Sequence, residues 1–169
     1  MKSIHFLLLL TISTLFVCSG NKEQRDFENE AYRSPSNITY TNIQGEITNT
    51  DPDDWRISPF YQGLVEIQPT YSPPYPNPAQ LGSNLNFEIS VTGVQPVNGL
   101  DIQIRFDDNT WRNIYSSFDN PLPIGLSTFQ IDPLTLGQFN TPESAKGLHR
   151  IFLFDFNQRL ISYGDILVE

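Results

Sequence analysis

Cysteine and histidine are almost absent from the sequence. Cys18 is the only cysteine, so no disulfide bond can form within one chain. Beyond the first 17 residues His149 is the only histidine, and one histidine without a further thiol cannot build a usual zinc site. We therefore expect a packing or solvated role for His149, and we expect no cofactor.

The sequence also lacks the motifs of common hydrolases and phosphate-binding enzymes. It contains no HExxH pair, no GxSxG setting for a nucleophilic serine, and no glycine-rich phosphate loop. Acidic pairs such as Asp107 and Asp108 adjoin predicted strand ends, where acidic turns are common. These absences predict that the protein is not an enzyme.

Basic residues are few. The chain has 10 Lys and Arg against 19 Asp and Glu, which gives a formal net charge of −9 at pH 7. An acidic surface repels phosphate backbones and anionic lipid headgroups. Nucleic acid is therefore excluded as an expected partner, and so is a basic patch that would dock on a membrane.

The only long apolar run lies at the N-terminus, where Lys2 precedes the segment 6–17. This run is shorter than the roughly 20 residues of a membrane-spanning helix and fits the apolar region of a secretory signal. Cys18 follows at once, with Leu15 three residues before it. This arrangement resembles the lipobox of bacterial lipoproteins, in which the cysteine becomes the first residue and carries the lipid.

The resemblance implies that residues 1–17 are a lipoprotein signal peptide and that Cys18 is lipidated. It further implies a bacterial cell-envelope protein, an outer-membrane lipoprotein held by its N-terminal lipid, on either the periplasmic or the surface face. The alternative is ordinary signal-peptidase cleavage after Ser19, which would remove Cys18. Residues 18–36 are polar and charged without an apolar period, so we expect a flexible tether there.

Residues 37–68 hold short strand-like pieces around an acidic loop, TNTDPDDW. Aspartates beside proline and ahead of an apolar run are common turn and capping residues. The alternative is a weak calcium site formed by Asp51, Asp53 and Asp54, because hard cations prefer several carboxylates. The loop has neither the glycine nor the distant glutamate of an EF-hand.

The second half of the chain alternates apolar and polar residues with period two. Segments 85–91 and 100–106 show this pattern, which is typical of half-buried strands, and we expect them to pair antiparallel, as in a hairpin. The segment 151–156, IFLFDF, is apolar at consecutive positions, which predicts a central strand covered on both faces. The segment 132–147 instead has two N-cap and proline pairs, so we expect one or two short helical turns crossing between sheets.

Several short strands separated by turns indicate an all-β fold, an Ig-like or fibronectin-like antiparallel β-sandwich. We expect one domain over residues 37–169, with its regular core at about 64–169. Prolines cannot sit inside a sheet ladder, so those of the segment 73–78 are expected to end a strand and carry the chain between sheets.

The motif YPNPA at 75–79 begins a stretch that resembles a known bacterial module. The stretch 75–169 is similar to the immunoglobulin-like domain of flagellar hook-cap proteins and to the C-terminal sorting domains of type IX secretion. The strands of the module follow one another in the same order here, as LDIQIRFDDNTW, then IGLSTFQID, then the closing strand pair. The resemblance implies an Ig-like sandwich. It does not imply the sorting role, because fewer than 60 residues after Cys18 precede the module, too few for a large cargo.

Aromatic residues gather near turns and proline segments, which favours binding over catalysis. Exposed aromatics can stack on sugar rings or anchor a protein partner. Trp55 and Trp111 could instead plug the ends of the sandwich. We expect a non-catalytic sandwich that binds or scaffolds another envelope or secreted protein, or alternatively a carbohydrate-binding module that holds a glycan. A row of exposed aromatics would favour sugar, whereas buried aromatics and an exposed sheet edge would favour protein. The candidate binding aromatics are Trp55, Tyr61, Tyr71, Tyr75, Trp111 and Tyr115.

Overall fold

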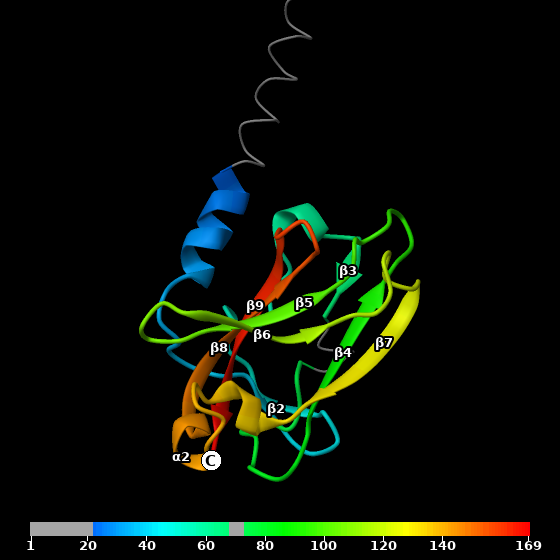
Figure 1. The fold of residues 1–169 in the computed structure, drawn as a ribbon. Coiled ribbons are helices and arrows are strands. Elements are labelled where there is room, and N and C mark those ends of the chain that lie inside the picture. The colour runs from blue at the N-terminus through cyan, green and yellow to red at the C-terminus, as the bar shows by residue number, and fades with distance from the viewer. Residues whose placement is uncertain (1–21, 68–72) are drawn as a thin grey trace, which may run out of the picture.

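The computed structural model describes residues 22–67 and 73–169, which form two facing antiparallel sheets with a small additional ribbon (Figure 1). The three-stranded sheet has the order β3–β4–β7, and the four-stranded sheet has the order β6–β5–β8–β9. The strands are β1 (Tyr40–Thr41), β2 (Ile47–Asn49), β3 (Val65–Glu66), β4 (Leu85–Val91), β5 (Asp101–Arg105), β6 (Trp111–Ser116), β7 (Gly125–Ile131), β8 (Gly147–Phe154) and β9 (Leu160–Val168). The predicted all-β antiparallel sandwich is confirmed.

Strand β4 illustrates how the alternating pattern becomes one wall of the core. Leu85, Phe87, Ile89 and Val91 are buried, while the residues between them are only partly covered. Strand β5 buries Ile102 and Ile104 in the same way. The predicted hairpin of these two strands is wrong, because β4 pairs with β3 and β7 whereas β5 pairs with β6 and β8. The two strands face each other across the core.

Strand β8 is central and covered on both faces, as the sequence predicts. It lies between β5 and β9, and its last four residues, 151–154, are all buried. Ile151 and Leu153 belong to the core between the sheets, whereas Phe152 and Phe154 belong to a second apolar cluster. That second cluster also contains Phe27, so an N-terminal segment covers the outer face of the sheet.

This N-terminal segment is a helix over residues 22–31 (Figure 1). Gln24, Phe27 and Ala31 lie on one helical face and are buried against the outer face of the four-stranded sheet. The predicted flexible tether is therefore wrong for residues 22–31, and its residues 18–21 lie outside the described part of the chain. Within the described ranges, no helix combines the length and apolar character needed to cross a membrane.

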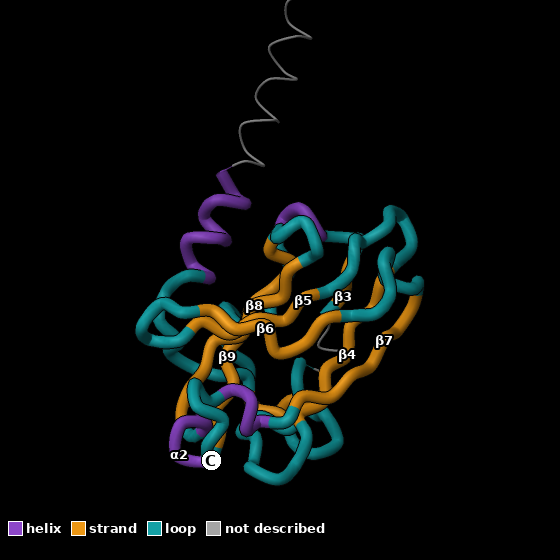
Figure 2. The backbone as a smooth tube through the Cα atoms, viewed as in Figure 1, coloured by secondary structure: helices purple, strands orange, loops and turns teal. Residues whose placement is uncertain are grey.

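The crossover from β7 to β8 contains the two predicted helical turns, drawn in purple at the periphery in Figure 2. They are η2 (Pro133–Leu136) and α2 (Pro142–Ala145). The Asp132 side chain accepts a hydrogen bond from the Leu134 N–H, and Thr141 forms a capping box with Ser144. The third short helix, η1 (Pro59–Tyr61), lies before β3.

The proline segment closes one side of the sandwich. Tyr75 bridges to Asn86 of β4, beyond the short strand β3, and Ala79 bridges to Val168 of the edge strand β9, so the segment contacts both sheets. It does not transfer the chain to another sheet, because β3 before it and β4 after it pair with each other. On the opposite side of the sandwich lie the edge strands β6 and β7.

Candidate functional site

Two of the aromatic residues predicted to bind a ligand lie inside the core. Trp55 is 5% exposed, and its ring meets Phe87 edge-on with a centroid distance of 5.9 Å. Tyr61 is 6% exposed and donates its hydroxyl hydrogen to Asp155 at 2.7 Å. Neither ring can reach a ligand at the surface. Tyr71 lies outside the described residues.

The other three candidates are also tied to neighbouring side chains. The Tyr75 hydroxyl donates to Glu88 at 3.0 Å. The Tyr115 ring stacks on Phe129 with centroids 4.3 Å apart. Trp111 is 42% exposed and tilts against Phe152, which places it on the outer face of the four-stranded sheet and not at an end of the sandwich. The described candidates do not form one exposed aromatic row.

The acidic loop has a structural role. Asp51 accepts a hydrogen bond from the Asp53 N–H at 3.1 Å, and Asp53 pairs with Arg56 at 3.2 Å. The Asp54 carboxylate accepts from the N–H groups of Thr39 and Asp165, at 2.8 and 2.7 Å. Burial raises the pKa of Asp54 to about 7.

These bonds give the aspartates the turn and capping functions that the sequence favours. No group of three or more histidine, cysteine or acidic side chains within residues 22–67 and 73–169 could hold a metal ion, which leaves the weak calcium site without support.

Arg150 connects the four-stranded sheet to the N-terminal helix. Its Nε and Nη2 donate to the two carboxylate oxygens of Asp165, at 2.6 and 2.7 Å. Its Nη1 donates to the backbone carbonyls of Glu30, Ala31 and Arg33, at 3.2, 3.3 and 2.9 Å. A cation beside the last carbonyls of a helix stabilises that terminus. The guanidinium therefore holds the end of the helix against β8 and β9.

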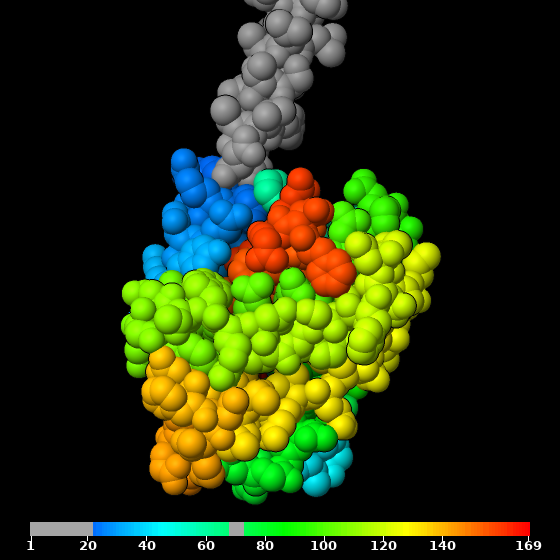
Figure 3. All heavy atoms as spheres, viewed as in Figure 1, coloured from blue at the N-terminus to red at the C-terminus, as the bar shows by residue number. Residues whose placement is uncertain are grey.

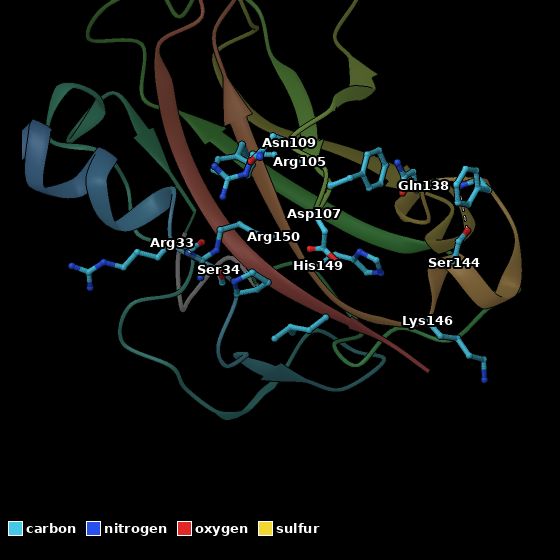
Figure 4. A pocket seen from close by; sticks show the side chains of 15 residues that line it. Arg33, Ser34, Arg105, Asp107, Asn109, Gln138, Ser144, Lys146, His149 and Arg150 are labelled. Atoms are coloured by element: carbon cyan, nitrogen blue, oxygen red, sulfur yellow. Dashed lines mark hydrogen bonds between the residues drawn. The ribbon is translucent and has the colours of Figure 1, made fainter.

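A cleft of about 430 Å³ lies beside Arg150 (Figure 4). In Figure 4 the side chains of Arg33 and Lys146 extend away from its centre, and Asp107 lies beside His149. The imidazole Nε2 is 2.7 Å from the Ala145 carbonyl, and burial lowers the pKa of His149, so the ring is neutral near pH 7. Ser144 is bonded within the capping box.

In this cleft the guanidinium of Arg150 is already paired, and the Ser144 hydroxyl and the His149 imidazole are bonded to nearby backbone. The cleft does not place a nucleophile next to a base, which acyl or glycosyl transfer would require. His149 has the packing role that the sequence predicts.

The outer edge of β7 has backbone groups that point away from the sheet. Asn86 exchanges two backbone hydrogen bonds with Tyr75, of 2.7 and 3.0 Å, on the side of β4 that faces away from β7. Backbone bonding alternates from one side to the other along a strand. The register places Leu126, Thr128 and Gln130 opposite Ser90, Glu88 and Asn86. The N–H and C=O groups of these three β7 residues therefore point away from β4.

The free edge of β7, defined as Leu126, Thr128 and Gln130, is also accessible from outside. All three side chains are exposed. Within the described residues, the N–H and C=O groups that these three residues point away from β4 have no hydrogen-bond partner. Figure 3 shows β7, in yellow, at the surface next to β6. The segment GLSTFQI contains neither a charged residue nor a proline.

Sequence reasoning missed the Arg150 contacts and the free edge of β7. The uncharged segment LSTFQI was the available signal for the free edge, because edge strands usually carry lysine or proline. Comparison with protein-family models and with curated proteins finds no match to this chain.

Proposed function

We propose that this chain is a non-catalytic β-sandwich, held at the bacterial cell envelope by a lipid on Cys18, that binds or scaffolds another envelope or secreted protein. The observation that carries the proposal is the free, uncharged edge of β7. An extended segment of a partner can join such an edge as an additional strand, with backbone hydrogen bonds providing affinity.

Other edges of the sandwich carry features that discourage pairing, namely a proline segment at β4 and β9 and a charged residue on β6. The proline segment bridges to β4 and β9 on the opposite side. On β6, the Arg112 guanidinium donates to the carbonyls of Thr135, Gly137 and Gln138, which ties the crossover to that strand. Strand β7 stays uncovered over seven residues. An unprotected edge of this length favours pairing with another chain.

The placement of the aromatics supports a protein partner over a glycan. A sugar ring needs an exposed aromatic face on which to stack. Trp55 and Tyr61 are buried, and Tyr115 is stacked on Phe129. The cleft at His149 is compatible with a non-catalytic function, because its imidazole, the Ser144 hydroxyl and the Arg150 guanidinium are each bonded to nearby chain.

Site-specific photocrosslinking tests the docking site. A photoreactive amino acid at Thr128, in the bacterium that makes the protein, is expected to capture one defined protein. The same group at Thr48, which is exposed on β2, serves as the matched control. Thr128→Pro removes an N–H that points away from β4, so the sandwich keeps its ladder and loses one docking hydrogen bond.

The expected result is a crosslinked product at position 128 that is missing at position 48. Parent protein added as a competitor should suppress this product, and Thr128→Pro protein should suppress it less well. Identical products from both positions would overturn the docking site. The anchor has its own readout: a clickable palmitate should label the parent and not Cys18→Ala, and an unlabelled parent would refute lipidation alone.

A further inference from the structure

Exposed apolar side chains gather at one end of the sandwich. The loops at this end are η1, the β4–β5 link 92–100, the β6–β7 link 117–124 and the β8–β9 turn 155–159. Phe118 is fully exposed, and Val94 and Ile124 are 73% and 75% exposed. The apolar end is defined here as Phe60, Val94, Phe118, Ile124 and Phe156, all of which are exposed.

Hydrogen bonds and contacts show that these loops are neighbours. The Phe156 N–H donates to the Asn98 carbonyl at 2.8 Å, and the Leu122 N–H donates to the Val97 carbonyl at 2.9 Å. The Ile124 side chain lies against Gly93. Helix η1 joins the group through the bond from Tyr61 to Asp155. In Figure 3 these segments share one end of the molecule.

The described chain begins at this same end. The helix 22–31 starts beside η1, where the Gln24 side chain accepts a hydrogen bond from the Phe60 N–H at 3.3 Å (Figure 1). Cys18 lies only four residues before Lys22, and four residues reach at most about 14 Å. Because the helix is packed on β8 and β9, it adds no extensible length between Cys18 and the sandwich. The C-terminus lies at the opposite end (Figure 1).

The charge at this end differs from that of the whole protein. The three loops 92–100, 117–124 and 155–159 contain Asp119, Asp155 and Arg159 as their only charged residues, and Asp155 is buried. The whole chain has a formal charge of −9. Most of the acidic side chains therefore lie on other surfaces, and an anionic membrane repels those surfaces more than the apolar end.

We infer that the apolar end rests on the phospholipid bilayer, with Phe118 and Ile124 entering the headgroup region. The inference rests on the proposed lipid at Cys18, because the short connection brings this end to the bilayer. Aromatic and aliphatic side chains at a membrane surface add apolar burial to the lipid anchor. Strand β7 begins at this end and runs away from it, so its free edge stays open to a partner (Figure 1).

The test anchors the protein chemically. A chain that starts at Cys18 retains every residue that the structure describes, and its single thiol can be coupled to a maleimide lipid in phosphatidylcholine nanodiscs. Nitroxide headgroups then broaden the NMR signals of residues close to the bilayer. We expect the amide signals of Phe118 and Ile124 to lose most of their intensity. Those of Ile43 and Phe139, equally exposed but on other elements, should keep theirs.

Two double variants distinguish insertion of the apolar side chains into the bilayer from mere closeness of the loops to it. Phe118→Ser with Ile124→Ser should at least halve the broadening at Val94, whereas Ile43→Ser with Phe139→Ser should leave it unchanged. The four side chains are exposed, so both variants should fold. Each apolar side chain that enters the bilayer should also strengthen vesicle partition of the uncoupled protein by about tenfold.

Three results would each overturn the inference. They are uniform broadening, broadening confined to Ile43 and Phe139, and a broadening profile that Phe118→Ser with Ile124→Ser leaves unchanged. Self-association of the protein through Phe118 and Ile124 in the absence of lipid would also overturn the inference. The apolar end would then be an interface between copies of the chain. Chemical coupling makes the result independent of cellular lipidation. A failed palmitate label and a failed nanodisc profile are thus separate outcomes.

Discussion

Replacing Phe27 by alanine tests whether the N-terminal helix belongs to the folded body. Phe27 is 2% exposed, and its ring centroid lies 5.2 Å from that of Tyr163, within a cluster that also contains Phe152 and Phe154. A fully enclosed Phe→Ala substitution costs about 3–5 kcal/mol. Here a single helix forms the cover and can shift, so we expect the lower limit, about 3 kcal/mol.

For a domain of this size that loss lowers Tm by about 10 °C. Denaturant titration of the parent and Phe27→Ala proteins gives the free energy of unfolding. Hydrogen exchange should show lost protection over residues 22–31 and intact protection in β4 and β7, because those strands belong to the core between the sheets. Phe118→Ala is the matched control, since a fully exposed side chain changes stability by no more than about 0.5 kcal/mol.

A change below about 0.5 kcal/mol in Phe27→Ala, with unaltered exchange over 22–31, would refute the docked helix. Residues 22–36 would then behave as the flexible tether that their composition predicts, and the short distance between Cys18 and the sandwich would no longer hold.

Three further predictions concern the contacts around β9. Arg150→Met leaves the buried carboxylate of Asp165 without its partner, and denaturant titration should show a loss of about 3–5 kcal/mol; a loss below 1 kcal/mol would contradict the buried pair. Burial raises the pKa of Asp54 to about 7, so folded protein retains a proton that unfolded protein releases near pH 3.8. The contribution of Asp54 to stability should therefore be greatest below about pH 4 and fall by up to about 4 kcal/mol between about pH 4 and 7, and Asp54→Asn should remove this part of the pH profile in thermal melts. Gly164→Ala places a methyl group against the Trp55 ring, so melts should show a loss of about 1–3 kcal/mol, and unchanged melting would contradict this packing.

The strands were predictable because their burial follows their sequence. Leu85, Phe87 and Ile89 alternate with polar residues and face the core. The consecutive apolar residues 151–154 face both the core and the helix-covered side. The caps at Asp132 and Thr141 were also predictable, because a side-chain acceptor followed by proline acts locally.

Strand partners were not predictable from the same pattern. Period two indicates that one face of a strand is buried and does not indicate which strand lies beside it. Segments 85–91 and 100–106 were therefore expected to pair, although they belong to opposite sheets. The helix 22–31 was missed because only Phe27 and Ala31 supply apolar contacts, too few to produce a clear period.

The candidate aromatics were misjudged for a related reason. Composition places Trp55 and Tyr61 near turns but does not reveal that both side chains turn inward. The free edge of β7 depends on long-range pairing, because Thr128 points its backbone groups outward only once β4 is fixed as its neighbour. The uncharged segment can be read from the local sequence, whereas its position at a free sheet edge depends on the topology.

The docked helix also constrains how a partner can approach. A flexible tether of roughly twenty residues would let the sandwich rotate freely above the bilayer. With Phe27 buried and Arg150 bonded to the helix terminus, the chain from Lys22 onward belongs to the folded body, and Lys22 lies only four residues after Cys18. The lipid proposed at Cys18 would then fix which end of the sandwich meets the membrane, and β7 extends away from that end (Figure 1). A partner strand on the proposed docking edge would therefore align roughly along the membrane normal, which would favour an extended segment that emerges from the bilayer surface over one that lies flat on it.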